Sequence, residues 1–112
     1  SRRRGLLSKK SLMHSESTVS NNSDKRRFEI EIDGHFAVAE YMIINNERII
    51  FTHTEVARPL EGRGLASLLA RHAFAWAKEQ QLKIMPLCPY MAGYMKRHPE
   101  YHDLLLPGFH LG

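Results

Sequence analysis

The sequence predicts a single α+β domain with a mixed, mainly antiparallel sheet and the element order β-β-β-α-β-α. Three observations lead to this fold class. The chain has 112 residues, which suits one domain with one core. Apolar and polar residues alternate over 28–33, as in a half-buried strand, and apolar residues recur at spacings of three and four over 65–77, as in a helix. Two turn signals divide the stretch 28–56 into three strands, which are expected to form an antiparallel meander.

The meander is expected to consist of a strand that begins at Phe28, a second over 35–44 and a third over 47–56. The connections are Asp33-Gly34 and Asn45-Asn46. Residues of these types tolerate the positive φ angles of tight turns. The first three strands are therefore expected to lie side by side in chain order.

A helix is expected after the third strand, because Pro59, Gly62 and Gly64 break the alternating pattern. Its apolar stripe consists of Leu65, Leu68, Leu69, His72, Ala73, Trp76 and Ala77.

A buried strand at 82–87 follows that helix. A second helix is expected from Pro89 to about Arg97, since Pro99 disfavours helical geometry at His98. The last strand can return beside the third one by a right-handed crossover and form a parallel pair.

The start of the chain differs in charge from the rest. Residues 1–27 carry eight Lys and Arg against two acids, a charge of +6, whereas residues 28–112 carry eight against ten, a charge of −2. We expect a disordered basic leader over residues 1–25, with a transit segment as an alternative, and a folded domain over 26–112. Because the folded part has no basic surplus, no nucleic-acid partner is expected.

Composition excludes several further classes of protein. Hydrophobic residues make up 43% and charged residues 25% of the chain, which argues against disorder throughout. No apolar run approaches the roughly 18 residues of a membrane span. The single cysteine cannot form an internal disulfide, so a cytoplasmic location and no membrane are expected. The oligomeric state is not predicted.

Gly62-Arg63-Gly64 opens the long helix and is a candidate anion site. Backbone N–H groups and the positive end of the helix dipole favour a phosphate there, and glycines let it approach closely. The alternative is that the glycines serve only the sharp turn.

This stretch resembles a known family. LEGRGLAS at 60–67 looks like the pyrophosphate loop of the GNAT acetyltransferase superfamily. Together with four further motifs in order, it resembles the short, stand-alone acetyltransferase-like branch (YjdJ-type): RRFEI at 26–30, HTEV at 53–56, PLCPY at 86–90 and RHPEY at 97–101.

The resemblance implies a compact GNAT-like acyl-CoA acyltransferase fold and acetyl-CoA as the co-substrate. The pyrophosphate would lie on the amides of 62–66 and the pantetheine arm along 55–57. The residues implied in coenzyme A binding are Val56, Ala57, Gly62, Arg63, Gly64, Leu65, Ala66, Ser67, Tyr90 and His98. Pro59 departs from the superfamily, which usually has Gln or Arg at that position.

Three residues are candidates for catalysis. Cys88 precedes Pro89 and is expected at the cap of the second helix, where the dipole favours a thiolate; an inert apolar role is the alternative. His53 is expected on the same strand face as Phe51, within contact of Cys88, although a core or rim role is the more common one for such a histidine. Glu55, two residues further on, is the reserve general base.

The sequence thus predicts an acetyl-CoA-dependent N-acetyltransferase with an unidentified amine acceptor. The alternative is a non-enzymatic module that binds CoA or an acyl-CoA. No metal site is expected, because Pro99 between His98 and His102 spoils a helical ligand pair.

Overall fold

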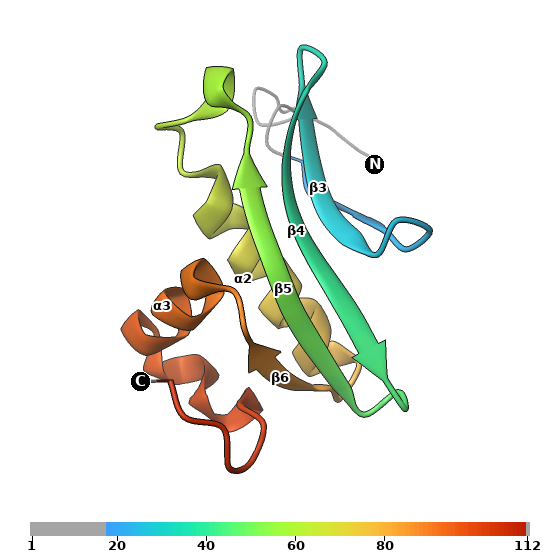
Figure 1. Cartoon of the computed structure of the whole chain (residues 1–112), viewed down its shortest axis with the longest axis vertical. Coiled ribbons are helices and arrows are strands. Elements are labelled where there is room, and N and C mark those ends of the chain that lie inside the picture. The colour runs from blue at the N-terminus through green and yellow to red at the C-terminus, as the bar shows by residue number, and fades with distance from the viewer. Residues whose placement is uncertain (1–17, 112) are drawn as a thin grey trace, which may run out of the picture.

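The computed structural model describes residues 18–111, and its sheet has the predicted mixed topology (Figure 1). Five strands lie in the order β2-β3-β4-β5-β6, antiparallel throughout except for the parallel pair of β5 with β6. The predicted α+β class is confirmed. The elements are β2 (Ser20–Asn22), β3 (Arg27–Ile32), β4 (His35–Ile44), β5 (Arg48–Val56), η2 (Arg58–Leu60), α2 (Leu65–Glu79), β6 (Lys83–Pro86), α3 (Pro89–Arg97) and η3 (Pro99–Leu104).

The tight turns of the meander form where the sequence predicts them. Asp33 and Gly34 have φ angles of 52° and 81°, and Asn45 and Asn46 have 55° and 53°. Two successive residues with positive φ match the twist of antiparallel strands. Asp33 and Gly34 therefore join β3 directly to β4.

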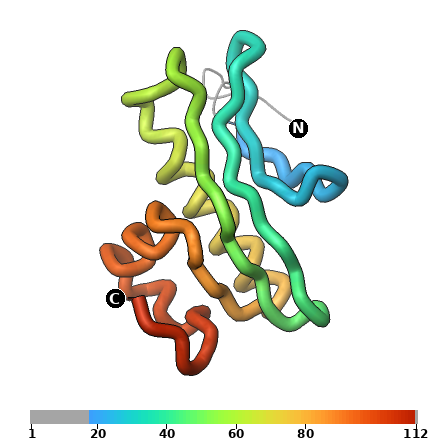
Figure 2. The backbone as a smooth tube through the Cα atoms, viewed as in Figure 1, coloured from blue at the N-terminus to red at the C-terminus, as the bar shows by residue number. Residues whose placement is uncertain are grey.

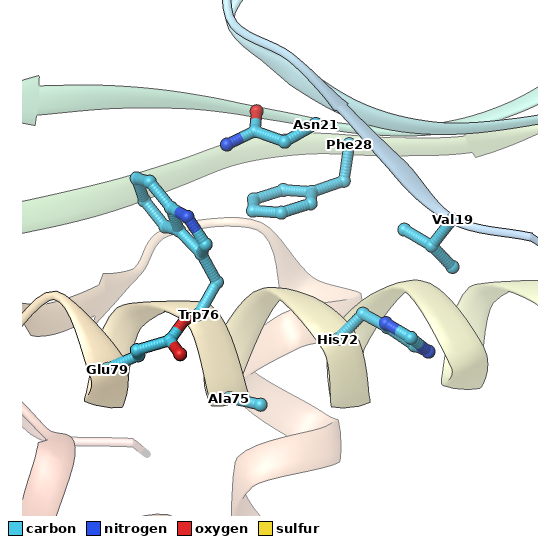
Figure 3. A pocket seen from close by; sticks show the side chains of 7 residues that line it. All are labelled: Val19, Asn21, Phe28, His72, Ala75, Trp76 and Glu79. Carbon is cyan, nitrogen blue, oxygen red and sulfur yellow. The ribbon is translucent and has the colours of Figure 1, made fainter.

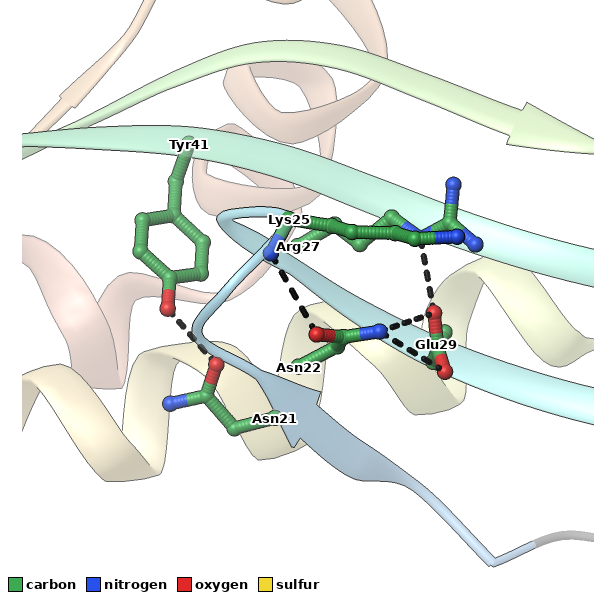
Figure 4. A network of polar contacts seen from close by, with 6 residues as sticks. All are labelled: Asn21, Asn22, Lys25, Arg27, Glu29 and Tyr41. Atoms are coloured by element: carbon green, nitrogen blue, oxygen red, sulfur yellow. Dashed lines mark hydrogen bonds and ion pairs between the residues drawn. The ribbon is translucent and has the colours of Figure 1, made fainter.

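The strand β2 corrects the expected boundary of the leader. Ser20–Asn22 pairs with β3, so residues 18–25 are not a disordered leader. The predicted leader over residues 1–17 lies outside the described residues. The Asn21 Oδ1 atom accepts a hydrogen bond of 2.6 Å from the Tyr41 hydroxyl, and the Asn22 amide donates to Glu29 at 3.4 Å (Figure 4). Side-chain bonds thus fix a strand that carries no hydrophobic period.

One face of the sheet packs on α2. The buried residues of this helix are Leu65, Leu69, Ala70, Ala73, Phe74 and Ala77. The apolar stripe is rotated from the predicted one, since Ala70 and Phe74 are buried whereas His72 is exposed. Small alanines let the helix approach the strands closely, and the Phe74 ring meets the rings of Phe51 and Tyr94 at centroid distances of 5.6 Å each.

The opposite face of β3, β4 and β5 is crossed by no helix of the described chain (Figure 1). The helix α3 contributes Met91, Tyr94 and Met95 to the same core as α2. We call the uncovered side the open face. Its side chains are those that alternate with the core-facing ones along each strand.

The buried hydroxyl of Tyr41 is the best-defined polar group of the core. Burial raises the pKa of Tyr41 above its ordinary value, and the hydrogen bond to Asn21 lowers it in part. Because this bond joins β2 to β4 across β3, it contributes to holding the edge strand in place.

We expect Tyr41→Phe and Asn21→Ala each to reduce the free energy of unfolding by about 1 kcal/mol. The double variant should lose little more than one single variant, since both remove the same bond. Urea denaturation measures this, with Tyr90→Phe as the control. Fully additive losses would contradict the role given to the bond.

Candidate functional site

A β-bulge in β5 decides which side chains reach the site. Glu40 pairs with His53 and Tyr41 pairs with Phe51, so Thr52 is an extra residue that has no partner in the register with β4. An extra residue reverses the alternation beyond it. Phe51 therefore faces the core below the bulge, and Thr54 takes up the inward position above it.

The bulge corrects the expected orientation of His53. The prediction placed His53 on the face of Phe51, but His53 and Glu55 lie on the open face. Their side chains are 53% and 69% exposed, and the His53 Nε2 atom is 3.0 Å from the Glu55 Oε1 atom. The two form a solvent-accessible imidazole–carboxylate pair.

The strands β5 and β6 separate beside the bulge. The β6 ladder pairs with β5 only from Arg48 to Phe51. The Cys88 amide then donates 2.9 Å to the Phe51 carbonyl, and the chain turns into α3. Figure 2 shows β6 beside only the lower part of β5. The upper part of β5 thus presents a backbone edge with no described strand beside it.

The predicted helix cap at Cys88 is present. Pro89 is the first residue of α3, Cys88 is its N-cap, and the thiol is only 4% exposed. The Cys88 Sγ atom donates a hydrogen bond of 3.2 Å to the Thr54 Oγ1 atom. The expected contact with His53 is not formed, because the bulge turns Thr54 inward in its place. Sequence reasoning missed Thr54, since no residue type marks a bulge.

The glycine turn forms the second part of the site. Gly62 and Gly64 have φ angles of 85° and 73°, and Gly64 is the N-cap of α2. The first helical bond runs from the Leu68 amide to the Gly64 carbonyl, so the amides of the first helical turn have no acceptor within the helix. This conformation confirms that the glycines allow the turn, and it leaves a helix N-terminus open to an anion.

A cavity of about 340 Å³ lies against this turn. It brings together most of the residues implied in coenzyme A binding, and its lining is Val56, Leu60, Glu61, Gly62, Gly64, Leu65, Ala66, Ser67 and Tyr90. Leu60 and Glu61, which belong to the LEGRGLAS motif, were not among the predicted binding residues.

Three of the implied residues do not line this cavity. Arg63 is exposed in the turn itself, and Ala57 lines a different cavity, on the open face. His98 lies at the C-terminal end of α3, where its ring stacks on Tyr94 at 4.1 Å and its Nδ1 atom is 3.4 Å from Glu100. The structure thus separates His98 from the glycine turn.

Another groove, of about 350 Å³, lies between β2, β3 and α2 (Figure 3). Its lining contains none of the predicted catalytic or binding residues: Val19, Asn21, Phe28, His72, Ala75, Trp76 and Glu79. We therefore do not include it in the candidate site. Residues 18–111 also contain no group of three or more His, Cys, Asp or Glu side chains arranged to hold a metal ion.

The chain is similar in sequence to known proteins. The model of the GCN5-related N-acetyl-transferase family matches residues 27–104. Protein NATD1 from Xenopus tropicalis is 31% identical over 93 residues, which cover 80% of this chain and 85% of that protein. Protein NATD1 from Homo sapiens is 31% identical over 93 residues, with 80% and 82% covered.

A solved structure has a similar fold. It is the solution NMR structure of a GCN5-like candidate N-acetyltransferase from Staphylococcus aureus. The TM-score is 0.65 at 25% sequence identity, and the match covers 82% of this chain and 90% of the other. Within residues 18–111, no helix combines the length and the apolar character that crossing a membrane requires.

The burial of Cys88 generates a prediction about its reactivity. We expect iodoacetamide to modify the folded chain at least about tenfold more slowly than the urea-unfolded chain, because the thiol is covered. Thr54→Ala should speed the reaction by removing the hydrogen-bond acceptor and opening space, whereas Thr54→Ser should not. Mass spectrometry follows the modification. Equal rates for the folded wild type, Thr54→Ala and Thr54→Ser would contradict the role given to the contact of Cys88 with Thr54.

Proposed function

The chain belongs to the GCN5-related N-acetyltransferase family, and on that basis we propose that it moves the acetyl group of acetyl-CoA to an amine acceptor. The observation that carries the proposal is the continuity of two features. The glycine-turn cavity begins at Val56, and the unpaired edge of β5 leads from there to Cys88 at the fork. An elongated ligand with a phosphate at one end and an acyl group at the other fits this path.

The first turn of α2 would hold the pyrophosphate. The free amides and the helix dipole favour negative charge there. Arg63 is exposed beside the turn and supplies a positive charge, whereas Glu61, in the cavity lining, opposes phosphate binding. The pantetheine amides would bond to the free backbone edge of β5, as a strand does.

The open face would receive the acceptor. His53 and Glu55 lie there as a pair, and the thioester carbonyl would reach them through the fork. If the Nε2–H group of His53 donates to Glu55, the Nδ1 atom is left as the acceptor for an amine proton. His53 is then the general base, and Glu55 fixes its tautomer.

The transfer releases protons that need acceptors. An ammonium ion first loses one proton to become a nucleophilic amine. Its nitrogen then forms the C–N bond, the C–S bond breaks, and the nitrogen loses a second proton. The leaving CoA thiolate takes up one proton, for which the Cys88 thiol, at the fork, is the nearest candidate donor that we propose. Cys88 then regains a proton from solvent, so the step balances.

The acceptor that best suits the open face is a cationic amine. A cavity of about 320 Å³ on this face has Glu40 and Glu55 in its lining, with Arg27 as the cation among them. Arg27 pairs with Glu29 at 2.7 Å and Glu55 pairs with His53, which leaves Glu40 as the cavity carboxylate that can attract a positive charge.

The glycine turn provides a test of coenzyme A binding. Gly64→Ala places a Cβ in a left-handed conformation, so it should cost about 1 kcal/mol of stability. It should also weaken CoA binding at least about tenfold, because the methyl group occupies the phosphate path. Gly34→Ala is the matched control. It has a φ of +81° and no atom within 4 Å, but it lies in the β3–β4 turn.

Calorimetry with CoA reads out both variants. An equal affinity for CoA in Gly64→Ala and Gly34→Ala would mean that Gly64 serves only the conformation of the turn and does not affect phosphate binding.

The catalytic assignment predicts a separation of turnover from binding. His53→Gln should lower kcat by about 100-fold or more with CoA affinity unchanged, and Glu55→Gln should lower it as well, since it orients the imidazole. The control is His72→Gln, an exposed histidine of α2. Release of CoA thiol from acetyl-CoA is measured with a set of lysine peptides and polyamines. Unchanged turnover in His53→Gln would remove it as the base.

The role of Cys88 is read from the same assay. As a proton donor, it should not become acetylated by acetyl-CoA alone, and Cys88→Ala should retain residual turnover. Acetyl-Cys88 in the absence of amine would instead favour a covalent path. CoA binding with no turnover on any amine would favour the non-enzymatic binding module.

A further inference from the structure

The lower half of the open face carries an apolar row across three strands. Met42, Ile50 and Met85 are successive partners in the registers of β4 with β5 and of β5 with β6. Their neighbours along each strand pack on the core side, all buried except the partly buried Ile43, so these three side chains lie on the open face. Met42 is 46% exposed, and Leu87, just after β6, is 55% exposed. They are the two exposed large hydrophobic residues of the described chain.

Two charged residues without ionic partners flank this row on opposite sides. Glu40 precedes Met42 by two positions in β4, and Arg48 precedes Ile50 by two positions in β5, which runs the other way. The carboxylate of Glu40 has no ion pair within residues 18–111, because Arg27 pairs with Glu29 and His53 pairs with Glu55. The Nε atom of Arg48 is buried, and no atom of residues 18–111 accepts a hydrogen bond from it.

This order of charges is self-complementary. Glu40 lies on one side of the row along the strand direction and Arg48 lies on the other side, each two residues from the row. A two-fold axis along the row would reverse the strand direction and bring the acidic end of one copy over the basic end of the other. Sheets pack face to face about 10 Å apart, a gap that Glu and Arg side chains can span together.

We propose that the open face binds a second copy of this chain in a two-fold, face-to-face dimer. The apolar rows pack on each other, and Glu40 of each copy pairs with Arg48 of the other, twice in one interface. A closed two-fold contact uses the same patch on both subunits, which the arrangement of Met42, Glu40 and Arg48 provides.

The size of the patch sets the expected strength of the dimer. A stable interface buries about 800 Å² on each partner. The patch is three strands wide and about five residues long, and it is smaller than this area. Neighbouring strands are about 4.8 Å apart, and successive residues in a strand are about 3.3 Å apart. We therefore expect a weak dimer that forms only at high protein concentration.

The dimer does not rest on the proposed acetyl transfer, although both would use the open face. His53 is beside Glu40 on that face, so a second copy and an acceptor amine would compete for it. The test reads molecular mass and not turnover. A failure of the enzymatic proposal therefore leaves its result unaffected.

A charge exchange tests the pairing. Arg48→Glu and Glu40→Arg each place like charges opposite one another and should weaken self-association about tenfold or more. In an equimolar mixture of the two variants, one contact pairs the two introduced residues and the other pairs the two native ones. Both contacts are then attractive, so the mixture should form a heterodimer although neither variant dimerises alone.

Sedimentation velocity of the full chain measures these states, and thermal melting shows that each variant is folded. Lys78→Glu, an exposed reversal on α2, is the matched control and should dimerise like the wild type. A wild type that stays monomeric up to about 500 μM, a concentration at which a weak specific dimer is populated, would overturn the proposal. So would a mixture of the two variants that stays monomeric, or a dimer unaffected by either reversal.

Discussion

The pairing of β4 with β5 across the bulge at Thr52 is the constraint on which the rest of the site depends. The ten-residue strand β4 fixes the position of β5 along its whole length. Because of this extra residue, odd-numbered residues of β5 face the core before Thr52, and even-numbered residues face it after Thr52. Phe51 below is a core residue, whereas above it Thr54 meets Cys88, and His53 is turned outward.

The fork between β5 and β6 follows from the same geometry. β6 is short because Pro86 and Pro89 flank the point where the chain must leave the sheet, and proline cannot continue a ladder. The amide of Cys88 makes the last link to Phe51, and α3 begins at once. The glycine turn of α2 meets the same end of β5, so the open edge and the helix N-terminus converge on one path.

Much of the fold could be predicted because it rests on local signals. The positive φ angles at Asp33-Gly34 and Asn45-Asn46 and the proline after Cys88 act through residues adjacent in the chain. The bulge could not be predicted, because it depends on how Glu40 and Tyr41 pair with another strand. The strand β2 was missed for a similar reason, since its polar residues are held by Tyr41, twenty positions away from Asn21. His98 was implied in cofactor binding by resemblance alone, and it stacks on Tyr94 outside the lining of the glycine-turn cavity.

The parallel pairing of β5 with β6 also bears on how the chain folds. Arg48 pairs with Lys83 across a long crossover, whereas β3 and β4 are joined by two residues. Loop-closure entropy grows with the logarithm of loop length, so bringing β6 to the sheet costs about 2.5 kcal/mol more than closing a hairpin. That cost is recovered only when α2 has packed its alanines against the strands. We therefore expect the meander to form before the fork assembles, because the long loop must be closed before the contacts of β6 can repay its cost.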